Sequence, residues 1–435
     1  MPSRNDVDYF GAGPAPLPDP VLEEAAKILL NYKDSGIGIQ EISHRGADAA
    51  DILEKTQLCL RQLLNIPQSD GPEGYQVLFL QGGGSGEFSA TVYHMVSVWV
   101  AKQWKHLKDY KLLGLDEDAV VDGLRDLVEE KMKIDYFVTG SWSLKASQEA
   151  ARLVGGEKVN IVTDSRKHRD GKFGVIAAQD TWTHTKEESD VVMTYYCDNE
   201  TVDGVEFQAT PSGHNLVADM SSNFLSRPID ITKYAAIYAG AQKNVGSTGI
   251  TIAIVSNKFM PPHAEMADPK LLRRLGLPVG PSVLDWPTIA KNKSLYNTLP
   301  IFDVWVAGKV MQRTLDLFSE ENGAPRLAGQ AAESKKKADM LYSVMDEHSS
   351  IYQVVPDKSI RSRMNLCFRV KGGDDEAEKT FLKGAESRGL LGIKGHRSVG
   401  GMRVSNYNAV PVAAVEKLAK YLLDYAKSEG ANGSV

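Results

Sequence analysis

The sequence predicts an α/β fold with a large domain, in which helices cover a mostly parallel sheet, and a smaller α+β C-terminal domain. Short apolar runs alternate with longer helical patterns through most of the 435 residues. These runs lack a strict polar–apolar alternation, which is typical of strands buried on both faces. Beyond about residue 315 the runs do alternate, as strands with one covered face should.

Seven apolar runs predict the strands of the large sheet. Helices are expected to start at Glu87 and at Leu144, after the first and the second run. The charged stretch 105–133 is interpreted as a solvated helical surface element, to which we assign no function. In chain order the apolar runs cover residues 76–80, 135–140, 158–164, 191–197, 215–220, 233–240 and 250–256.

The C-terminal part has a different pattern of elements. Its periodicity predicts a closing helix from Pro411, preceded by helices over 332–348 and 375–390 and by strands over 351–355 and 363–370, with the segment 400–405 before the closing helix. A chain of this length exceeds the size at which one core usually divides. We therefore expect a large domain over residues 20–315 and a small domain formed by residues 1–19 and 316–435.

Composition excludes several classes of protein. Hydrophobic residues make up 42% and charged residues 24% of the chain, as in ordinary globular proteins. No run reaches the roughly 18 apolar residues of a membrane span, and residues 1–14 show no apolar signal core. Three cysteines without metal-ligand spacing fit a reducing compartment, so a cytoplasmic location is expected. A net charge of −6 argues against nucleic acid as the main partner.

A glycine-rich turn, LFLQGGGSGEFSA, lies between the first predicted strand and its helix. Such a turn presents free backbone N–H groups and a helix N-terminus, which together bind phosphate. It lacks the Gly-Lys-Ser/Thr ending of a nucleoside-triphosphate loop and the spacing of a dinucleotide fingerprint. A smaller phosphorylated ligand or cofactor is one interpretation, and a plain tight turn is about as common.

Two side chains follow strand ends, where ligands bind in doubly wound sheets. Asp219 ends the run NLVADM and is suited to pairing with a protonated ring nitrogen, although helix capping is the commoner role of such an aspartate. Trp142, in TGSWSLKA, offers an indole face for stacking on a ring, although a single tryptophan is more often part of the core.

Lys243 follows the strand-like run KYAAIYAG by three residues, among glycines and amides. A desolvated lysine beside a carboxylate and a phosphate-binding turn is the set of groups that a pyridoxal phosphate enzyme requires. An isolated lysine after a turn would ordinarily be a surface residue. Because three independent features converge, we expect Lys243 to form a Schiff base with pyridoxal 5′-phosphate.

Two basic segments complete the candidate site. His44 and Arg45 lie in EISHRG, and His396, Arg397 and Arg403 lie among glycines in IKGHRSVGGMRVS. Arginine binds carboxylates and phosphates through paired hydrogen bonds, so a dianionic substrate is expected. A solvated basic loop is the simpler alternative. No HExxH, paired-cysteine or GxSxG motif is present, and no metal is expected.

Nine segments together make the chain similar to a known family. It resembles the phosphoserine aminotransferases, which are class V, fold-type I pyridoxal phosphate enzymes with an aspartate aminotransferase-like fold. The segments that carry the resemblance run nearly end to end and are GAGPAPLP, EISHRG, VLFLQGGGSGEF, DYFVTGSWS, CDNETVDGVEF, LVADMSSNFLSRPID, YAGAQKNVG, SLYNTLP and GHRSVGGMRVSNYNAV.

The resemblance implies a role for each matching residue toward the cofactor. Lys243 would bond to the cofactor, Asp219 would pair with its ring nitrogen, and Trp142 would stack on the ring. Asn297 and Thr298 would reach the cofactor phosphate of the neighbouring subunit, which implies a homodimer with shared sites. Further cofactor contacts would come from Gly84, Ser85, Thr201 and Gln242.

The resemblance also implies the substrate contacts and the reaction. Arg45 would hold the substrate α-carboxylate with His44 nearby, and His396, Arg397 and Arg403 would bind a phosphate or side-chain carboxylate. L-glutamate and 3-phosphohydroxypyruvate would give 2-oxoglutarate and O-phospho-L-serine, in serine biosynthesis. Formation of 4-phosphohydroxy-L-threonine is a second reaction left open.

Four rival functions are less well supported by the sequence. An alanine–glyoxylate or serine–pyruvate aminotransferase would not need the His396–Arg403 segment. A cysteine desulfurase needs an exposed thiol, whereas Cys367 lies in the strand-like run RMNLCFRV. A catalytically inactive binding protein would not need Lys243 and Asp219. A nicotinamide oxidoreductase needs a spaced glycine fingerprint that the chain lacks.

Overall fold

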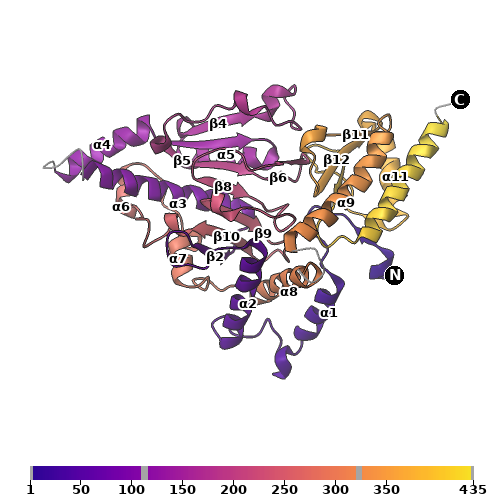
Figure 1. Ribbon diagram of the computed structural model, residues 1–435, viewed down its shortest axis with the longest axis horizontal. Helices are drawn as coiled ribbons and strands as arrows, with labels where there is room; N and C mark the ends of the chain where they lie inside the picture. Colours follow the sequence, from indigo (N-terminus) through magenta and orange to yellow (C-terminus); the bar gives the residue numbers. More distant parts are fainter. Residues whose placement is uncertain (1–2, 109–115, 320–325, 433–435) are drawn as a thin grey trace.

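A seven-stranded sheet lies at the centre of the computed structural model, which describes residues 3–108, 116–319 and 326–432 (Figure 1). All seven predicted strands are present. In spatial order they are β2 (Tyr75–Leu80), β10 (Thr251–Ser256), β9 (Ala236–Gly240), β8 (Leu216–Asp219), β5 (Val191–Cys197), β3 (Lys133–Val138) and β4 (Val159–Asp164). The prediction of a mostly parallel sheet is confirmed.

Strand β10 is the exception, because it runs antiparallel to both β9 and β2. The chain leaves β9, makes the turn that contains Lys243, and returns directly as β10. A direct return of this kind produces an antiparallel pair, whereas the other strands are joined by longer crossovers. Lys243 therefore lies on a short connection that is anchored by a strand at each end.

Both faces of the sheet are covered, as the apolar runs indicated. In β2, Val77 and Phe79 belong to one buried cluster and Leu78 and Leu80 to the other. The first cluster includes side chains of α1 (Asp19–Ile28), α2 (Ala47–Leu64) and α8 (Ile301–Leu317). The second includes side chains of α3 (Gly83–His106), α4 (Glu117–Glu130), α5 (Ser141–Val154), α6 (Pro269–Arg274) and α7 (Trp286–Lys291).

Two helices begin earlier than predicted. Helix α3 begins at Gly83 rather than Glu87, because Gly82, with φ of 117°, turns the chain directly into the helix. Helix α5 begins at Ser141 rather than Leu144. Both the glycine-rich segment and Trp142 therefore belong to the first turns of helices, where backbone N–H groups are free to bind a partner.

The charged stretch 105–133 forms less of a solvated surface than expected. Within it, helix α4 buries Val120, Val121, Leu124 and Val128 against the core and exposes its charged residues. The helix starts at a cap in which Asp116 accepts a hydrogen bond from the N–H of Ala119, at 2.8 Å. Residues 109–115 of the stretch lie outside the described residues.

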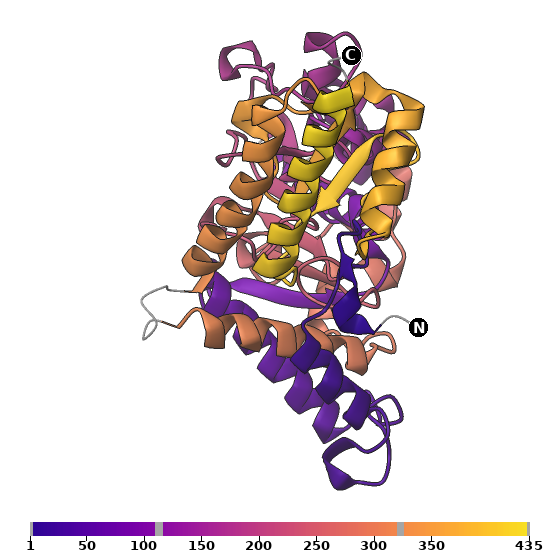
Figure 2. The ribbon, with the colours of Figure 1, turned by 90° about the vertical axis from the view of Figure 1, so that its right-hand side faces the viewer.

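The C-terminal unit, residues 326–432, is a separate α+β layer. Its three strands, in the order β11 (Tyr352–Val354), β12 (Asn365–Val370) and β14 (Met402–Ser405), are antiparallel. Figure 2 shows α9 (Arg326–Glu347) and α11 (Val412–Asn432) lying side by side. The unit also contains α10 (Asp375–Glu386) and β13 (Leu390–Leu391).

The N-terminal segment joins the C-terminal unit. Strand β1 (Asp8–Tyr9) pairs in parallel with β13, and Phe10 is buried in the core of the C-terminal unit. The exact division of the chain at residues 20 and 315 stays a prediction. Among the described residues, no helix is long and apolar enough to cross a membrane.

Candidate active site

Lys243 occupies the turn between β9 and β10 and is partly buried. Its Nζ donates a hydrogen bond to the hydroxyl oxygen of Thr201, at 2.7 Å. Desolvation lowers the pKa of Lys243 to about 8, against the opposing effect of the negative charge of Asp219. The amine is therefore much more available as a nucleophile and as a base than an ordinary surface lysine.

Asp219 is the last residue of β8, beside β9, and only 5% of it is exposed. One of its oxygens accepts a hydrogen bond from the N–H of Ser221, at 2.8 Å. Burial raises the pKa of Asp219, whereas the hydrogen bonds from Ser221 and the charge of Lys243 lower it. The two adjacent strand ends thus bring a buried carboxylate and a desolvated amine into electrostatic contact.

The glycine-rich segment lies against this carboxylate. A Cβ atom on Gly84 would lie 3.6 Å from the Ser221 hydroxyl oxygen and 3.9 Å from an oxygen of Asp219. Ser85 is the next residue and is exposed. The first turn of the 24-residue helix α3 therefore lies beside Asp219, with its partial positive charge available to an anion.

Trp142 lies in the first turn of α5 and is partly buried. The Nζ atom of Lys145 lies 4.4 Å from the centre of the indole ring. The ring Nε1 is shielded from solvent and has no hydrogen-bond partner in the described chain. An unpaired buried donor is a feature of a site that is completed by a ligand.

A positively charged group comes from the C-terminal unit. Arg403, on β14, donates a hydrogen bond to the carbonyl oxygen of Thr201, at 3.4 Å. The Nδ1 atom of His396 lies 2.7 Å from the Ser398 hydroxyl oxygen. Desolvation and the positive charges of Arg403, Lys145 and Arg397 lower the pKa of His396. Four basic side chains thus influence one another next to Thr201 and Lys243.

The N-terminal segment also reaches the site, which the sequence analysis did not predict. The N–H of Ala15 donates a hydrogen bond to the carbonyl oxygen of Gln242, at 2.8 Å. A Cβ atom on Gly13 would lie 3.7–3.8 Å from the aliphatic carbons of Lys243. The only sequence signal was the glycine and proline pattern GAGPAPLP. Lys145 was missed as well, because nothing in its local sequence marks it.

Four residues that the sequence analysis assigned to the site have no direct link to Lys243 within one chain. No hydrogen bond or ion pair of the described residues links His44, Arg45, Asn297 or Thr298 to Lys243. Asn297 and Thr298 are exposed, and Asn297 donates a hydrogen bond to the side-chain oxygen of Gln81, at 2.6 Å. His44 and Arg45 directly precede α2, which lies beside α8 in Figure 1.

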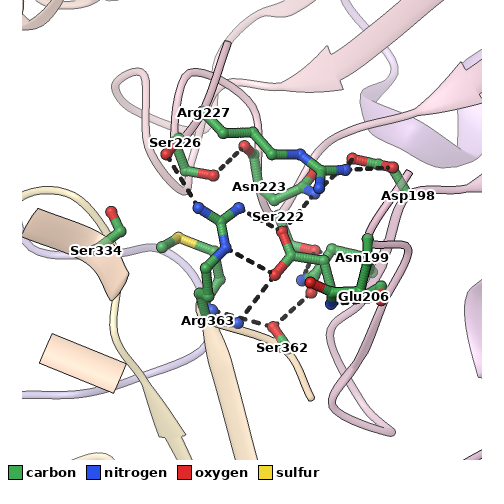
Figure 3. Close-up of polar contacts among 12 residues, drawn as sticks. Asp198, Asn199, Glu206, Ser222, Asn223, Ser226, Arg227, Ser334, Ser362 and Arg363 are labelled. Carbon is green, nitrogen blue, oxygen red and sulfur yellow. Dashed lines mark hydrogen bonds and ion pairs between the residues drawn. The ribbon is translucent and has the colours of Figure 1, made fainter. Parts of the chain in front are cut away.

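A buried polar network fixes the loop that carries Thr201 (Figure 3). Before the loop, Asp198 accepts two hydrogen bonds from Arg227, at 2.7 and 2.8 Å. After it, Glu206 accepts a hydrogen bond from Arg363 of the C-terminal unit, at 2.7 Å. Since these charges are paired and hydrogen-bonded inside the protein, they lock the junction between the central sheet and the C-terminal unit.

The chemistry of the assembled groups fits a phosphorylated aromatic aldehyde. A desolvated amine lies beside a buried carboxylate, and a helix N-terminus lies beside that carboxylate. The adjacent residues Glu200 and Thr201 bind the backbone of Trp142 and the amine of Lys243. Among residues 3–108, 116–319 and 326–432, no group of three or more potential ligands is placed to hold a metal ion.

Comparison with known proteins agrees with this arrangement. The sequence profile of the family described as "Aminotransferase class-V" matches residues 117–418. The chain is 38% identical to the phosphoserine aminotransferase of Saccharomyces cerevisiae, over 98% of each protein. Both the profile and the relative cover far more than half of this chain.

Solved structures give the same result. The phosphoserine aminotransferase from Bacillus circulans subsp. alkalophilus is 32% identical, with a TM-score of 0.78 over 97% of this chain and 98% of that one. The enzyme from Trichomonas vaginalis, described as bound to PLP, is 33% identical, with a TM-score of 0.74 over 95% and 98% of the two chains. The chain is therefore an enzyme of the class V aminotransferases and belongs, within them, to the phosphoserine aminotransferase family.

Proposed function

We propose that the protein transfers the amino group of L-glutamate to 3-phosphohydroxypyruvate, giving O-phospho-L-serine and 2-oxoglutarate in serine biosynthesis. The observation that carries the proposal is the group of Lys145, His396, Arg397 and Arg403 beside Lys243. Phosphate and carboxylate groups both require such a cationic surface. The names of the similar enzymes support the same substrates.

Pyridoxal 5′-phosphate is the cofactor that the site fits. Lys243 would hold it covalently, Asp219 would face its ring nitrogen, and Trp142 would cover its ring. The cofactor, when bound, supplies an electron-withdrawing ring that stabilises negative charge at the substrate Cα. The phosphate would be held by the start of α3 together with other polar groups of the site, namely Gly84, Ser85, Thr201 and Gln242.

Lys243 also provides the proton transfer. Because its pKa lies near 8, a useful fraction of the amine is neutral at neutral pH and accepts the proton of the substrate Cα. Thr201, which accepts a hydrogen bond from Nζ, holds the amine in place. Asp219 would favour a protonated ring nitrogen, because a buried carboxylate is stabilised by an adjacent cation.

The basic group selects the substrate. Arg403 and Arg397 provide permanent positive charge, since guanidinium groups stay protonated. His396, whose pKa is lowered, donates a hydrogen bond as a neutral imidazole at neutral pH. One set of planar guanidinium groups accommodates either the phosphate of one substrate or the side-chain carboxylate of glutamate.

The active unit is proposed to be a homodimer. Asn297 and Thr298 are exposed, and no hydrogen bond or ion pair of the described residues joins them to Lys243. Arg45 is exposed and His44 is half-buried, and the His44 Nε2 atom is shielded from solvent without a hydrogen-bond partner among the described residues. A second copy of the chain would complete the site with these four residues. A cytoplasmic location also stays a proposal.

The test is to record the visible absorption of the cofactor-loaded protein before and after addition of O-phospho-L-serine, L-serine or L-alanine. We expect the cofactor band to change fully with O-phospho-L-serine and little with the other two amino acids. In Arg403→Gln the response to O-phospho-L-serine should need about 10- to 100-fold more substrate, because a charged hydrogen bond is lost. A response to L-alanine alone would favour an alanine–glyoxylate type of aminotransferase.

A further inference from the structure

The hairpin turn that carries Thr201 contacts two functional side chains at once. It lies between the short strands β6 (Asn199–Glu200) and β7 (Val205–Glu206). The Thr201 hydroxyl accepts a hydrogen bond from Lys243, at 2.7 Å, and its carbonyl oxygen accepts one from Arg403, at 3.4 Å. The turn therefore fixes the distance between the amine of the central sheet and an arginine of the C-terminal unit.

The two acidic residues of the same turn hold the start of α5. Glu200 accepts hydrogen bonds from the N–H groups of Trp142 and Ser143, each at 2.9 Å. Asp203 accepts one from the N–H of Ser141, at 2.7 Å. These are three of the four N–H groups that a helix leaves unpaired at its start. The helix carries Trp142, so the turn also fixes the backbone of that residue.

Helix α5 depends on this distant cap. Gly140, at the cap position, has no side chain that accepts a hydrogen bond. A Cβ atom there would lie 2.3–2.6 Å from side-chain atoms of Glu200, so the glycine leaves the space that the carboxylate fills. Glu200 is fully buried, and Asp203 is 5% exposed. A capping carboxylate from a segment almost 60 residues away is a specific structural arrangement, because helices are usually capped by the adjacent residue.

The turn itself is rigidly held. Asn223 bridges the two ends of the segment by donating hydrogen bonds to Asp198, at 2.6 Å, and to Glu206, at 3.1 Å. Asn199 donates a hydrogen bond to the side-chain oxygen of Asn365, on β12, at 2.8 Å. Figure 3 shows Asp198, Asn199 and Glu206 of the segment 198–206 in contact with side chains of both parts of the molecule. A segment held in this way transmits a displacement of one contact to the others.

We infer that Glu200 and Asp203 are positioning residues that keep Trp142, Lys243 and Arg403 in register through one rigid turn. The inference rests on the proposed function, because it assigns Trp142 to the cofactor ring and Arg403 to the substrate. Each acid acts through the start of α5 and the backbone of Thr201. Neither needs to touch substrate or cofactor.

Hydrogen-bond geometry favours ionised carboxylates in this place, whereas burial opposes them. Burial and the adjacent charge of Asp203 raise the pKa of Glu200 to about 8, against the opposing effect of the N–H groups of Ser143 and Trp142. Both Glu200 oxygens accept N–H hydrogen bonds, which a carboxylate does better than a neutral acid. The partial positive charge at the start of the 14-residue helix α5 adds to this stabilisation.

The experiment compares Glu200→Gln and Asp203→Asn with the wild-type holoenzyme. A glutamine accepts one N–H but turns its own NH2 group toward the other, so the start of α5 must shift. We expect kcat/KM to fall about 10- to 100-fold in Glu200→Gln, since small misplacements of catalytic groups have effects of this size. Asp203→Asn should show a smaller loss, because one hydrogen bond changes. The visible circular dichroism of the bound cofactor should change in both.

A double-mutant cycle with Trp142→Phe identifies the route. If Glu200 acts through Trp142, adding Glu200→Gln to the Trp142→Phe variant should lower kcat/KM by less than about threefold. Strictly additive losses, or Glu200→Gln activity within twofold of the wild type, would overturn the inference. If Glu200→Gln does not fold, the same cycle is made with Asp203→Asn. It then shows whether the loss in kcat/KM depends on Trp142 or is additive to that of Trp142→Phe.

Asp135→Asn is the matched control. Asp135 is also buried and accepts hydrogen bonds from Asn160, at 2.8 Å, and from the Thr185 hydroxyl, at 2.6 Å, but contacts none of the three functional side chains. It should lower stability while leaving the cofactor spectrum unchanged. A wild-type protein that binds cofactor but ignores O-phospho-L-serine would refute the proposed function only. The spectra of the Glu200 and Asp203 variants would still test the positioning role.

Discussion

Two desolvated lysines in this molecule have the same lowered pKa and different roles. Desolvation lowers the pKa of Lys243 and of Lys337 to about 8 in each case. Lys337, on α9, is fully buried and donates hydrogen bonds to two backbone carbonyl oxygens, of Tyr407 at 3.0 Å and of Val410 at 2.8 Å. Lys243 is partly exposed, and the hydrogen bond from its Nζ goes to a single side-chain hydroxyl.

The difference shows that a shifted pKa does not by itself mark a reactive residue. Lys337 is satisfied by rigid backbone acceptors and has no open side, so it stabilises the turn before α11. Lys243 is partly exposed and lies beside a buried carboxylate, so its amine is accessible for reaction. What distinguishes the two lysines is the geometry of their partners, and each prediction below tests part of that distinction.

The largest effect is expected from Lys243→Ala. Loss of the amine removes both the covalent attachment and the base, so turnover should fall by at least about 10⁴-fold. The fold should be retained, because only one side-chain hydrogen bond is lost. Steady-state kinetics and circular dichroism check the two parts, and an active Lys243→Ala protein would contradict the assignment.

Asp219→Asn should have the next largest effect on activity. An amide keeps the shape but not the negative charge, so a proton on the ring nitrogen is no longer stabilised. We expect kcat to fall about 10²- to 10³-fold, as for other losses of a fixed electrostatic group. Kinetics of the cofactor-saturated variant measure this. A loss below tenfold would mean that another group holds the proton.

Lys337→Met should reverse the pattern, with a large loss of stability and a small loss of activity. Methionine fills the space but leaves the carbonyl groups of Tyr407 and Val410 without a donor, which should lower the free energy of unfolding by about 2–4 kcal/mol. Activity should change less than tenfold. Urea unfolding provides the measurement. Lys335→Met, on the exposed side of the same helix, is the control and should be nearly neutral.

A smaller effect should appear in the pH dependence of stability. Lys337 has a pKa of about 8 when folded, against an ordinary value of 10.5. Between these values the unfolded chain binds more protons, so this lysine makes the free energy of unfolding rise with pH, by at most about 1.4 kcal/mol per unit. In Lys243→Ala, the free energy of unfolding should still rise with pH through Lys337. In the double variant Lys243→Ala/Lys337→Met, the contribution of Lys337 to this rise should be absent. Equal slopes in the two variants would show that Lys337 has an unshifted pKa.

The strands of the central sheet and the proximity of Asp219 and Lys243 could be predicted from the sequence. Apolar runs mark where strands end, and parallel strands bring their carboxyl ends to one edge, so Asp219 and Lys243 were expected to be neighbours. The direction of β10 was not predicted, because a direct return after Lys243 has no distinct apolar pattern. The starts of α3 and α5 were placed too late, since glycine-rich segments resemble loops.

The long-range contacts of the site were not predictable from local patterns. Nothing near Glu200 indicates that it caps a helix beginning at Ser141, and nothing near Gly13 indicates that it packs on Lys243. Lys337 lies within the helix predicted over 332–348 without being singled out, and its burial follows from the packing of α9 on α11. Such contacts depend on how distant elements pack together.

The parallel pairing of β1 with β13 has a consequence for biosynthesis. Segment 8–15 is translated before its partners, because it bonds to Gly389 and Leu391, to Tyr407 and to Gln242, all made much later. At roughly 5–20 residues per second, its partners near residue 407 follow only after tens of seconds. These contacts of the N-terminal segment therefore form only after residues 389–407 have been made, and the cofactor site is completed no earlier.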